Sequence, residues 1–422
     1  MIDVLTIINF IFLCLLAFFI NKKVRSQPLG IYFLPGLAIK ILGGILLGLL
    51  YIVYYQGGDA ILFHEDATIL ARLAFASPDE YFRILILGDK VHEYWDKLVL
   101  TEQPRAFLAV KILSFFHLFT GNNFWISGFY FSFFAYAGLW SLANRLTTYF
   151  PWTRKAAVIS CLFFPSVVFW SSGISKEAIA TGLMTWIVAI YIPLFGRGEL
   201  IPKRWVFISF VLLFLLWSIK YYQAGILLAI LTPSMIVAYI KSFSIGVSWR
   251  FHKQLLYWLS FLVWTTLIAS FVHPNLRLDN IMHVAVENNV LFNSMSDPAD
   301  LIKYNDLSAS WKGIVKNIPI ATFSGLFRPL TGDVEGFPQM LAAIENLVLF
   351  VLSLVALIGV FRVNSSNNGI FVIAVLLYII VTATLLAIST PNFGTLVRYK
   401  SAFLPFFVYI ILADFPLLRL LK

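Results

Sequence analysis

Long apolar runs constrain this chain more than any other feature of its sequence. About eleven such runs recur along its 422 residues. Several approach the roughly 20 residues that a helix needs to cross the hydrocarbon layer of a bilayer. Only 12% of the residues are charged, against about 25% in a soluble globular protein. The sequence therefore predicts an all-α polytopic membrane protein rather than a soluble fold.

The apolar runs give the expected positions of the membrane-spanning helices. We expect spans at about 4–20, 36–55, 124–143, 155–171, 178–195, 205–219, 223–240, 255–272, 342–361, 369–388 and 401–418. A further apolar run at about 106–120 is short and carries Lys111 and His117. We interpret it as an interfacial or re-entrant helix, because it is too short and too polar for a full span.

Charge tests this assignment. If 106–120 does not span, the short loops on one side collect most of the cations, and the positive-inside rule assigns that side to the cytoplasm. These cations are Lys22, Lys23, Arg25, Arg145, Arg154, Lys155, Arg197, Lys203, Arg204, Lys241, Arg250, Lys253, Arg362, Arg419 and Lys422. Of 21 acidic residues, only Glu199 and Asp414 fall on that side. We expect the N-terminus outside, the C-terminus in the cytoplasm, and the long loops 56–123 and 273–341 outside.

The rest of the composition fits one transmembrane domain over 1–422. The net charge of +10 follows the helix ends, so topology explains it better than a nucleic-acid partner does. Cys14 and Cys161 both lie in apolar runs and are expected to be reduced packing residues. The stretch 78–87 has the amphipathic pattern of a helix lying on the membrane surface. The loop 273–341 is expected to form short helices that cap the bundle.

An acidic stretch, Gln56-Gly57-Gly58-Asp59 to His64-Glu65-Asp66, directly follows the second apolar run. Its two glycines allow the backbone to turn as it leaves the membrane. In a helix, Asp59 and Asp66 would share one face. Asp59, Glu65 and Asp66 are therefore candidate catalytic acids, with His64 as a candidate substrate-binding group and Asp59 and Asp66 as candidate metal ligands. The alternative is a solvated loop start.

A second stretch, 164–177, runs from a helix end through a Ser-Ser-Gly turn to Lys176 and Glu177. Backbone N–H groups at the start of a helix form a ready anion site. Lys176 and Glu177 are therefore candidate binding residues, against the alternative of an ordinary turn. Lys220 lies at another expected external helix end and is a weaker candidate of the same kind.

Two further stretches place cations at expected external helix ends. Arg328 lies in 324–330, and Arg398 and Lys400 lie in 390–400. The positive-inside bias makes basic residues unusual there. Because arginine offers a planar fork to phosphate and lysine a compact charge, phosphate binding is favoured over membrane anchoring, which stays the alternative.

Together, the acids and cations predict surface chemistry on a lipid-borne substrate. An acid could activate a hydroxyl, and a cation or a divalent metal such as Mg²⁺ or Mn²⁺ could stabilise a phosphate leaving group. A polyprenyl phosphate or pyrophosphate sugar has the lipid tail, the anionic head and the group to transfer. The sequence has no nucleotide-type phosphate loop, no zinc-protease motif and no Gly-x-Ser-x-Gly elbow.

These motifs resemble those of the GT-C class of integral-membrane glycosyltransferases, in particular the bacterial enzymes that use lipid-linked sugars. The resemblance rests on the acidic motif at 58–66, the amphipathic stretch behind it, and the later motifs at 164–177, 327–329 and 392–400. It implies a multi-pass protein of the bacterial inner membrane with its active face in the periplasm. It further implies transfer of a sugar or oligosaccharide from a polyprenyl-linked donor to a glycan, lipid or protein acceptor.

By this resemblance, Asp59 matches the catalytic acid of the family's first external loop, with Glu65 and Asp66 as supporting acids. The sequence departs from the family in one respect. GT-C enzymes usually carry that loop after the first span, whereas here it follows the second.

Two other functions remain open. A polysaccharide polymerase of the O-antigen type also joins lipid-linked sugars outside the membrane, but relies more on external arginines than on a loop carboxylate. A flippase or transporter for lipid-linked sugars would instead show repeats and polar groups at mid-bilayer depth. Only Lys40 lies well inside an expected span, which favours surface chemistry over transport.

Overall fold

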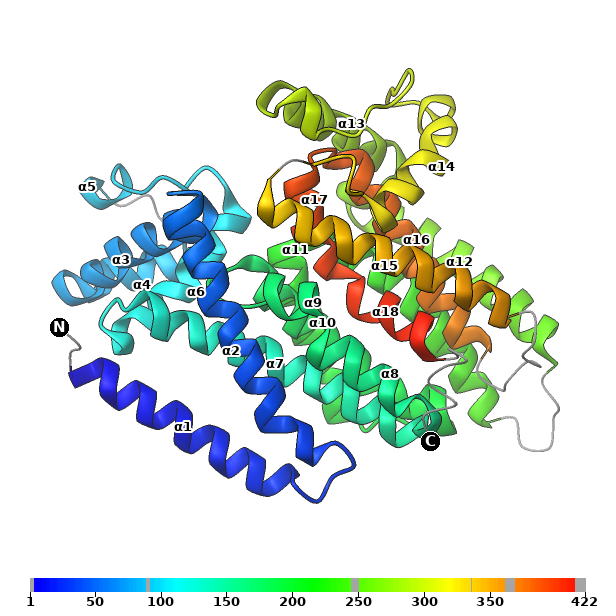
Figure 1. The fold of residues 1–422 in the computed structure, drawn as a ribbon, viewed down its shortest axis with the longest axis horizontal. Coiled ribbons are helices and arrows are strands. Elements are labelled where there is room, and N and C mark those ends of the chain that lie inside the picture. The colour runs from blue at the N-terminus through cyan, green and yellow to red at the C-terminus, as the bar shows by residue number, and fades with distance from the viewer. Residues whose placement is uncertain (1–3, 89–91, 244–249, 335, 361–368, 414–422) are drawn as a thin grey trace. The chain divides into compact units, whose positions relative to one another are not determined.

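The chain is helical throughout the part that the structure describes. The computed structural model describes residues 4–88, 92–243, 250–334, 336–360 and 369–413 (Figure 1). Its α-helices are α1 Val4–Val24, α2 Phe33–Leu49, α3 Asp59–Ala76, α4 Pro78–Ile86, α5 His92–Trp95, α6 Pro104–Thr120, α7 Phe124–Tyr149, α8 Arg154–Val158, α9 Pro165–Trp170, α10 Lys176–Arg197, α11 Lys203–Phe243, α12 Phe251–Val272, α13 Leu278–Met295, α14 Trp311–Phe327, α15 Phe337–Val360, α16 Gly369–Ser389, α17 Phe393–Tyr399 and α18 Leu404–Ala413. The predicted all-α class is confirmed over these residues.

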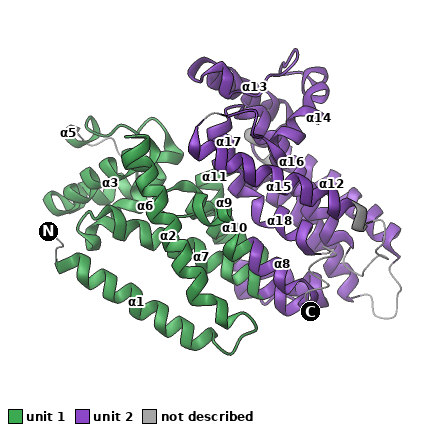
Figure 2. Cartoon of the chain, in the orientation of Figure 1, with its two compact units in different colours: residues 1–144, 161–189, 209–221 green, residues 145–160, 190–208, 222–422 purple. Residues whose placement is uncertain are grey.

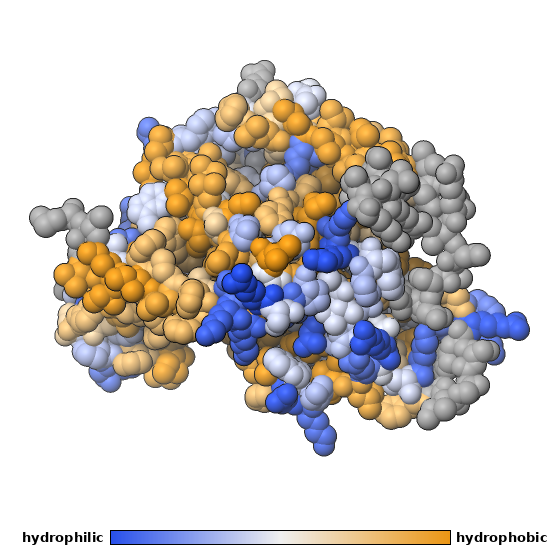
Figure 3. All heavy atoms as spheres, turned by 60° about the horizontal axis from the view of Figure 1, so that its bottom comes forward, coloured by the Kyte–Doolittle hydropathy of each residue, from blue (hydrophilic) through white to orange (hydrophobic). Residues whose placement is uncertain are grey.

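Eight helices in the described ranges are long and apolar enough to cross a membrane, and a bent pair would make a ninth span. The eight are Val4–Val24, Gly30–Tyr54, Phe124–Tyr149, Lys176–Arg197, Lys203–Phe243, Phe251–Phe271, Phe337–Leu357 and Gly369–Ser389. Apolar side chains such as Phe18 and Phe19 of α1 stay exposed, and the surface carries broad hydrophobic areas (Figure 3). Such areas are expected where lipid rather than water covers a protein. The prediction of a multi-pass membrane protein is confirmed at this level.

The expected continuous span at 155–171 is wrong. This segment is divided into α8, a π-helical turn at Ile159–Phe163, and α9. Phe164 is extended, with φ −68° and ψ 123°, and Pro165 starts the new helix. Proline disfavours helical geometry in the residue before it and has no N–H to continue the helix.

The expected spans at 205–219 and 223–240 occur within one element, α11, which is 41 residues long. Lys220 interrupts it with non-helical backbone angles of φ −140° and ψ 74°. A straight helix of this length would be about 60 Å long, twice the thickness of the hydrocarbon layer. The interruption at Lys220 therefore agrees with two spans.

The last expected span, at 401–418, is a bent element. Phe393–Ala402 and Leu404–Ala413 meet at an angle of 68°. Residues 414–418 lie outside the described part of the chain, as do the last residue of the expected span 342–361 and the predicted cytoplasmic cations Arg362, Arg419 and Lys422.

The chain groups into two compact units (Figure 2). Unit 1 comprises residues 1–144, 161–189 and 209–221, and unit 2 comprises residues 145–160, 190–208 and 222–422. Each unit is described by itself. The single transmembrane domain expected over 1–422 stays a prediction.

Unit 1 is built around α3, which packs along α6 and α4. Ala67, Leu70 and Ala71 of α3 are fully buried in this contact. On α4, Tyr81 is buried and its hydroxyl lies 3.1 Å from Ser114 Oγ of α6, whereas Phe82 is exposed. The helix predicted in the amphipathic stretch at 78–87 is therefore present, and apolar side chains also lie on its exposed side.

Unit 2 is built around α16, which packs against α12, α13, α14 and α18. Gly325 of α14 allows one close contact, since a Cβ there would collide with the backbone of Ala383 in α16. Helices are present in the segment 273–341, as expected, but α13 and α14 are 18 and 17 residues long. They are longer than the short capping helices that the sequence suggested.

Candidate functional site: an acidic helix start in unit 1 and a cationic cluster in unit 2

Asp59 is the first residue of α3 and follows the candidate membrane span Gly30–Tyr54 after a short turn. Gly58 precedes it with φ +100°, an angle that glycine adopts at little cost, and a Cβ there would lie 3.0 Å from the ring of Tyr51. The N–H of Gly57 donates to the carbonyl of Tyr51 at 3.1 Å and tightens the turn. Asp59 is partly exposed. Its carboxylate is thus presented at the positive end of the α3 dipole.

The acidic stretch meets the stretch 164–177 inside unit 1. Ala60 is buried with Leu47 and Tyr51, and Phe169 and Trp170 of α9 pack against this cluster. Lys176 Nζ lies 5.5 Å from the centroid of the Phe63 ring, one turn after Asp59 on α3. Two motifs that are about a hundred residues apart in the sequence are therefore neighbours around the start of α3.

Many polar groups in and around the Ser-Ser-Gly turn form hydrogen bonds within the protein. Ser171 and Ser172 donate to the carbonyls of Val167 and Val168, each at 2.5 Å. The N–H of Gly173 donates to Ser132 Oγ at 2.8 Å. The N–H of Ala178, in the first turn of α10, donates to Ser175 Oγ at 3.1 Å. Two of the N–H groups in the predicted anion site are thus already bonded within the protein.

Glu177 and Lys220 bind each other. Lys220 Nζ lies 2.7 Å from Glu177 Oε1, and the two side chains are 5% and 3% exposed. From the sequence, both are predicted to be substrate-binding groups. In the structure they form a buried ion pair that ties the start of α10 to the interruption in α11.

Asp66 holds a loop. Its Oδ1 accepts from the N–H of Val99 at 3.0 Å and its Oδ2 accepts from the N–H of Leu100 at 2.9 Å. The residue is 1% exposed, whereas its neighbour Glu65 is exposed. Asp66 shares the helix with Asp59 as predicted, but both of its oxygens bind backbone, which assigns it a structural role.

We expect Asp66→Ala to destabilise the protein by about 2–5 kcal/mol, since a charge-assisted hydrogen bond contributes about 1.5–3 kcal/mol. Glu65→Ala is the matched control, because surface changes usually stay within about 0.5 kcal/mol. Thermal unfolding in detergent and proteolysis of the loop around Val99 would measure both effects. Equal stability of the two variants would contradict the structural role.

His64 lies beside His117 of α6, with ring centroids 5.0 Å apart. Burial lowers the pKa of His64. Burial, and to a lesser extent the neighbouring His64, lowers the pKa of His117 to about 3. His117 Nδ1 lies 3.4 Å from Thr68 Oγ1. Both imidazoles are therefore neutral near pH 7, and His64 is directed into the helix interface rather than toward an anionic substrate.

A divalent metal finds few ligands around the start of α3. Both oxygens of Asp66 bind backbone N–H groups, and Glu65 is exposed. Over the described residues, no group of three or more His, Cys, Asp or Glu side chains is arranged to hold a metal ion. Because Mg²⁺ is usually bound by one or two carboxylates together with waters and substrate phosphates, a metal held by Asp59 stays a prediction.

Arg328 forms the centre of the cationic cluster in unit 2. Its Nε and Nη2 donate to the two oxygens of Asp333 at 2.8 and 2.5 Å. Hydrogen bonds from this guanidinium hold the pKa of Asp333 below its ordinary value. The guanidinium lies 4.8 Å from the ring centroid of Phe393, in the stretch 390–400. Arginine has five N–H donors, so three remain beyond the bonds to Asp333.

Lys400 connects the same two stretches. Its Nζ donates to the carbonyls of Leu326 and Arg328 at 3.1 and 2.8 Å, and to Asn346 Oδ1 at 3.0 Å. An ammonium group has three donors, and these three bonds account for them. Lys400 therefore holds the end of α14 rather than presenting its charge to a substrate.

Tyr304 lies near Arg328, and Arg398 belongs to the stretch 390–400 that contacts Arg328 through Phe393. The hydroxyl of Tyr304 is buried with no hydrogen-bond partner among the described residues. Burial raises the pKa of Tyr304, and the nearby Arg328 opposes that shift. Arg398 is partly buried, with its guanidinium 5.1 Å from the ring centroid of Tyr399. Tyr304 could not be predicted from the sequence, because a single tyrosine in a polar loop has no distinguishing pattern.

The four predicted stretches thus meet in pairs. The acidic stretch and 164–177 meet in unit 1, and 324–330 and 390–400 meet in unit 2. A common vestibule for Asp59, Arg328 and Arg398 stays a prediction. Comparisons with protein-family models, with curated proteins and with solved structures find no match.

Proposed function

We propose that the protein is a GT-C-like membrane glycosyltransferase of a bacterial inner membrane. It would transfer a sugar or oligosaccharide from a polyprenyl phosphate or pyrophosphate donor to a glycan, lipid or protein acceptor on the periplasmic face. The observation that carries the proposal is the pairwise meeting of the four stretches. One pair places a carboxylate after the end of a membrane helix, and the other places Arg328 near the buried hydroxyl of Tyr304.

Asp59 is the proposed general base. Its carboxylate takes the proton of the acceptor hydroxyl as that oxygen attacks the anomeric carbon of the donor sugar. The bond from the anomeric carbon to the phosphate oxygen breaks, and the lipid phosphate leaves with the electron pair. The proton on Asp59 then passes to water. Among the three acids of the stretch, Asp59 suits this role best, because Asp66 is bonded on both oxygens and Glu65 is exposed.

Arg328 is the proposed phosphate-binding group. Its bonds to Asp333 fix the guanidinium plane, and its side chain stays 24% exposed. The remaining N–H donors and the Tyr304 hydroxyl offer bonds to an anionic oxygen, where charge-assisted hydrogen bonds are strong. Arg398 is a second cation for the same lipid phosphate, and Lys400 acts as a positioning residue.

We expect Arg328→Ala to lower kcat/KM for a polyprenyl-linked donor about 10- to 150-fold, since a hydrogen bond to a charged group contributes about 1.5–3 kcal/mol. Asp333→Asn is the matched control, because it keeps the size of the side chain and the Arg328 guanidinium while removing one of the two bonds between them. The assay would follow transfer of a labelled sugar by purified protein in liposomes. Equal losses in the two variants would show that Arg328 only supports the turn.

The two alternative functions predict different results in this assay. Loss of transfer in Arg328→Ala or Arg398→Ala together with an active Asp59→Asn would support a polysaccharide polymerase. Movement of labelled lipid-linked sugar across the liposome membrane without any transfer product would support a transporter.

A further inference from the structure

A pocket lies within unit 2 at the helix ends that carry the basic loops. It has a volume of about 340 Å³ and is formed where α10 and α11 end and where α12 and α16 begin. The positive-inside rule assigns these ends to the cytoplasm. The same rule assigns Arg328 and Arg398 of unit 2 to external helix ends, so the pocket is expected on the other side of the membrane from these two residues.

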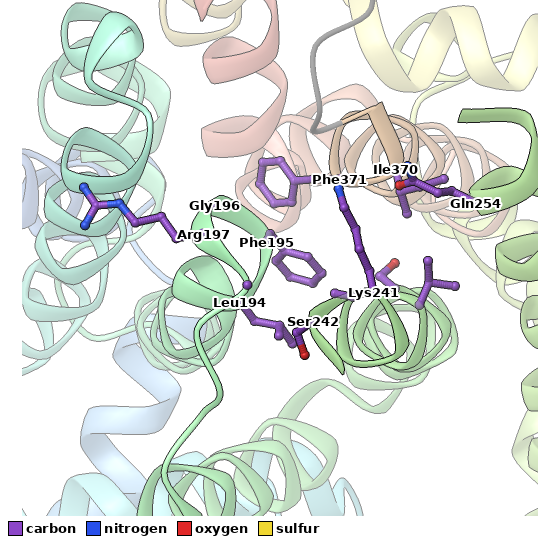
Figure 4. A pocket seen from close by; sticks show the side chains of 13 residues that line it. Leu194, Phe195, Gly196, Arg197, Lys241, Ser242, Gln254, Ile370 and Phe371 are labelled. Carbon is purple, nitrogen blue, oxygen red and sulfur yellow. The ribbon is translucent and has the colours of Figure 1, made fainter. Parts of the chain in front are cut away.

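The pocket combines an aromatic wall with a cation. Phe195 and Phe371 line it with ring centroids 5.4 Å apart. Lys241, in the last turn of α11, reaches across the pocket toward the start of α16, whereas Arg197 points away (Figure 4). Gln254, in the first turn of α12, adds a buried amide.

The residues that line the pocket include no Asp or Glu, and Glu199, which follows the lining residue Gly198, is bonded elsewhere. Glu199 Oε1 lies 3.8 Å from Arg197 Nη1, and Glu199 Oε2 accepts from the Tyr149 hydroxyl at 2.6 Å. The first N–H groups of α12 and α16 lack intrahelical acceptors and carry the positive end of each helix dipole. Charge in the pocket is therefore complementary to an anion.

We propose that this pocket binds the phosphate headgroup of an anionic phospholipid of the cytoplasmic leaflet. Its volume is within the range of ligand sites, about 300–1,000 Å³. Lys241 and Gln254 bind the phosphate oxygens, and the rings of Phe195 and Phe371 contact the glycerol and the first acyl carbons. Basic pockets between membrane helices on the cytoplasmic side are known to hold such headgroups.

The test is binding of phosphatidylglycerol to the delipidated full-length protein, followed by native mass spectrometry in detergent. The wild type is expected to retain phosphatidylglycerol in preference to phosphatidylcholine. Lys241→Ala is expected to weaken this binding about tenfold, since it removes one charge-assisted bond. Gln254→Leu keeps the volume of the side chain and is expected to weaken binding about threefold, as for a neutral hydrogen bond.

Lys203→Ala is the matched control, because Lys203 lies on the same helix, at its other end, and is exposed. It is expected to leave phosphatidylglycerol binding unchanged, and thermal unfolding would verify that all variants fold. Equal weakening in the Lys203 and Lys241 variants would show that the lipid is held only by nonspecific electrostatic attraction, and it would overturn the proposal. Displacement of the lipid by excess inorganic phosphate would overturn it in favour of a free-phosphate site.

Discussion

Asp59→Asn is expected to abolish sugar transfer while leaving the protein folded. The amide cannot accept the proton of an acceptor hydroxyl, and positioned general bases contribute about 100- to 10 000-fold to the rate. Asparagine keeps the size of the side chain and is also favoured near helix starts, so α3 should form unchanged. The measurement is the turnover of a labelled polyprenyl-linked sugar by purified variants in liposomes.

Asp79→Asn is the matched control for this experiment. Asp79 also lies in the first turn of a helix, α4, and is exposed, so the loss of charge near a helix start is the same in both variants. Turnover should be unchanged in Asp79→Asn. Full activity of Asp59→Asn would remove the proposed base, and equal losses in the two variants would point to a general electrostatic effect.

Breaking the Glu177–Lys220 pair is expected to have the largest effect on stability. Glu177→Leu removes the carboxylate 2.7 Å from Lys220 Nζ, in a site where both side chains are at most 5% exposed. Removing one partner of a buried ion pair costs about 3–5 kcal/mol, because the remaining charge keeps its desolvation penalty. Thermal or denaturant unfolding in detergent would measure the loss.

The double variant Glu177→Leu with Lys220→Met separates charge from packing. Apolar side chains of similar volume often replace a buried ion pair at little cost, so the double variant should recover most of the stability lost by the single one. A double variant that is as unstable as the sum of its single changes would show that the pair is not coupled in this way.

The helices at and near the proposed site could be predicted from local signals. Two glycines before Asp59 predicted the turn out of the membrane, and α3 does begin at Asp59. The amphipathic pattern at 78–87 predicted the helix seen as α4. Pro165 is a local signal for the break in 155–171, but the apolar composition of the run favours a continuous span.

The partners of the polar residues could not be predicted in the same way. Asp66 binds the backbone of Val99 and Leu100, 33 and 34 residues further along the chain. Lys400 binds the carbonyl of Arg328, 72 residues before it. Nothing in the local sequence distinguishes an acid that holds a loop from an acid that does chemistry, because both occur at the same kind of position on a helix.

By itself, the sequence determined that the chain is an all-helical membrane protein and which stretches carry its polar groups. Apolar run length and charge bias decide these properties, because the bilayer acts on every residue of a span in the same way. Only the tertiary structure decided which polar groups neutralise one another inside the protein, as Glu177 and Lys220 do, and which stay partly exposed, as Asp59 does. The physical reason is that burial and hydrogen bonding depend on contacts between residues that are distant along the chain.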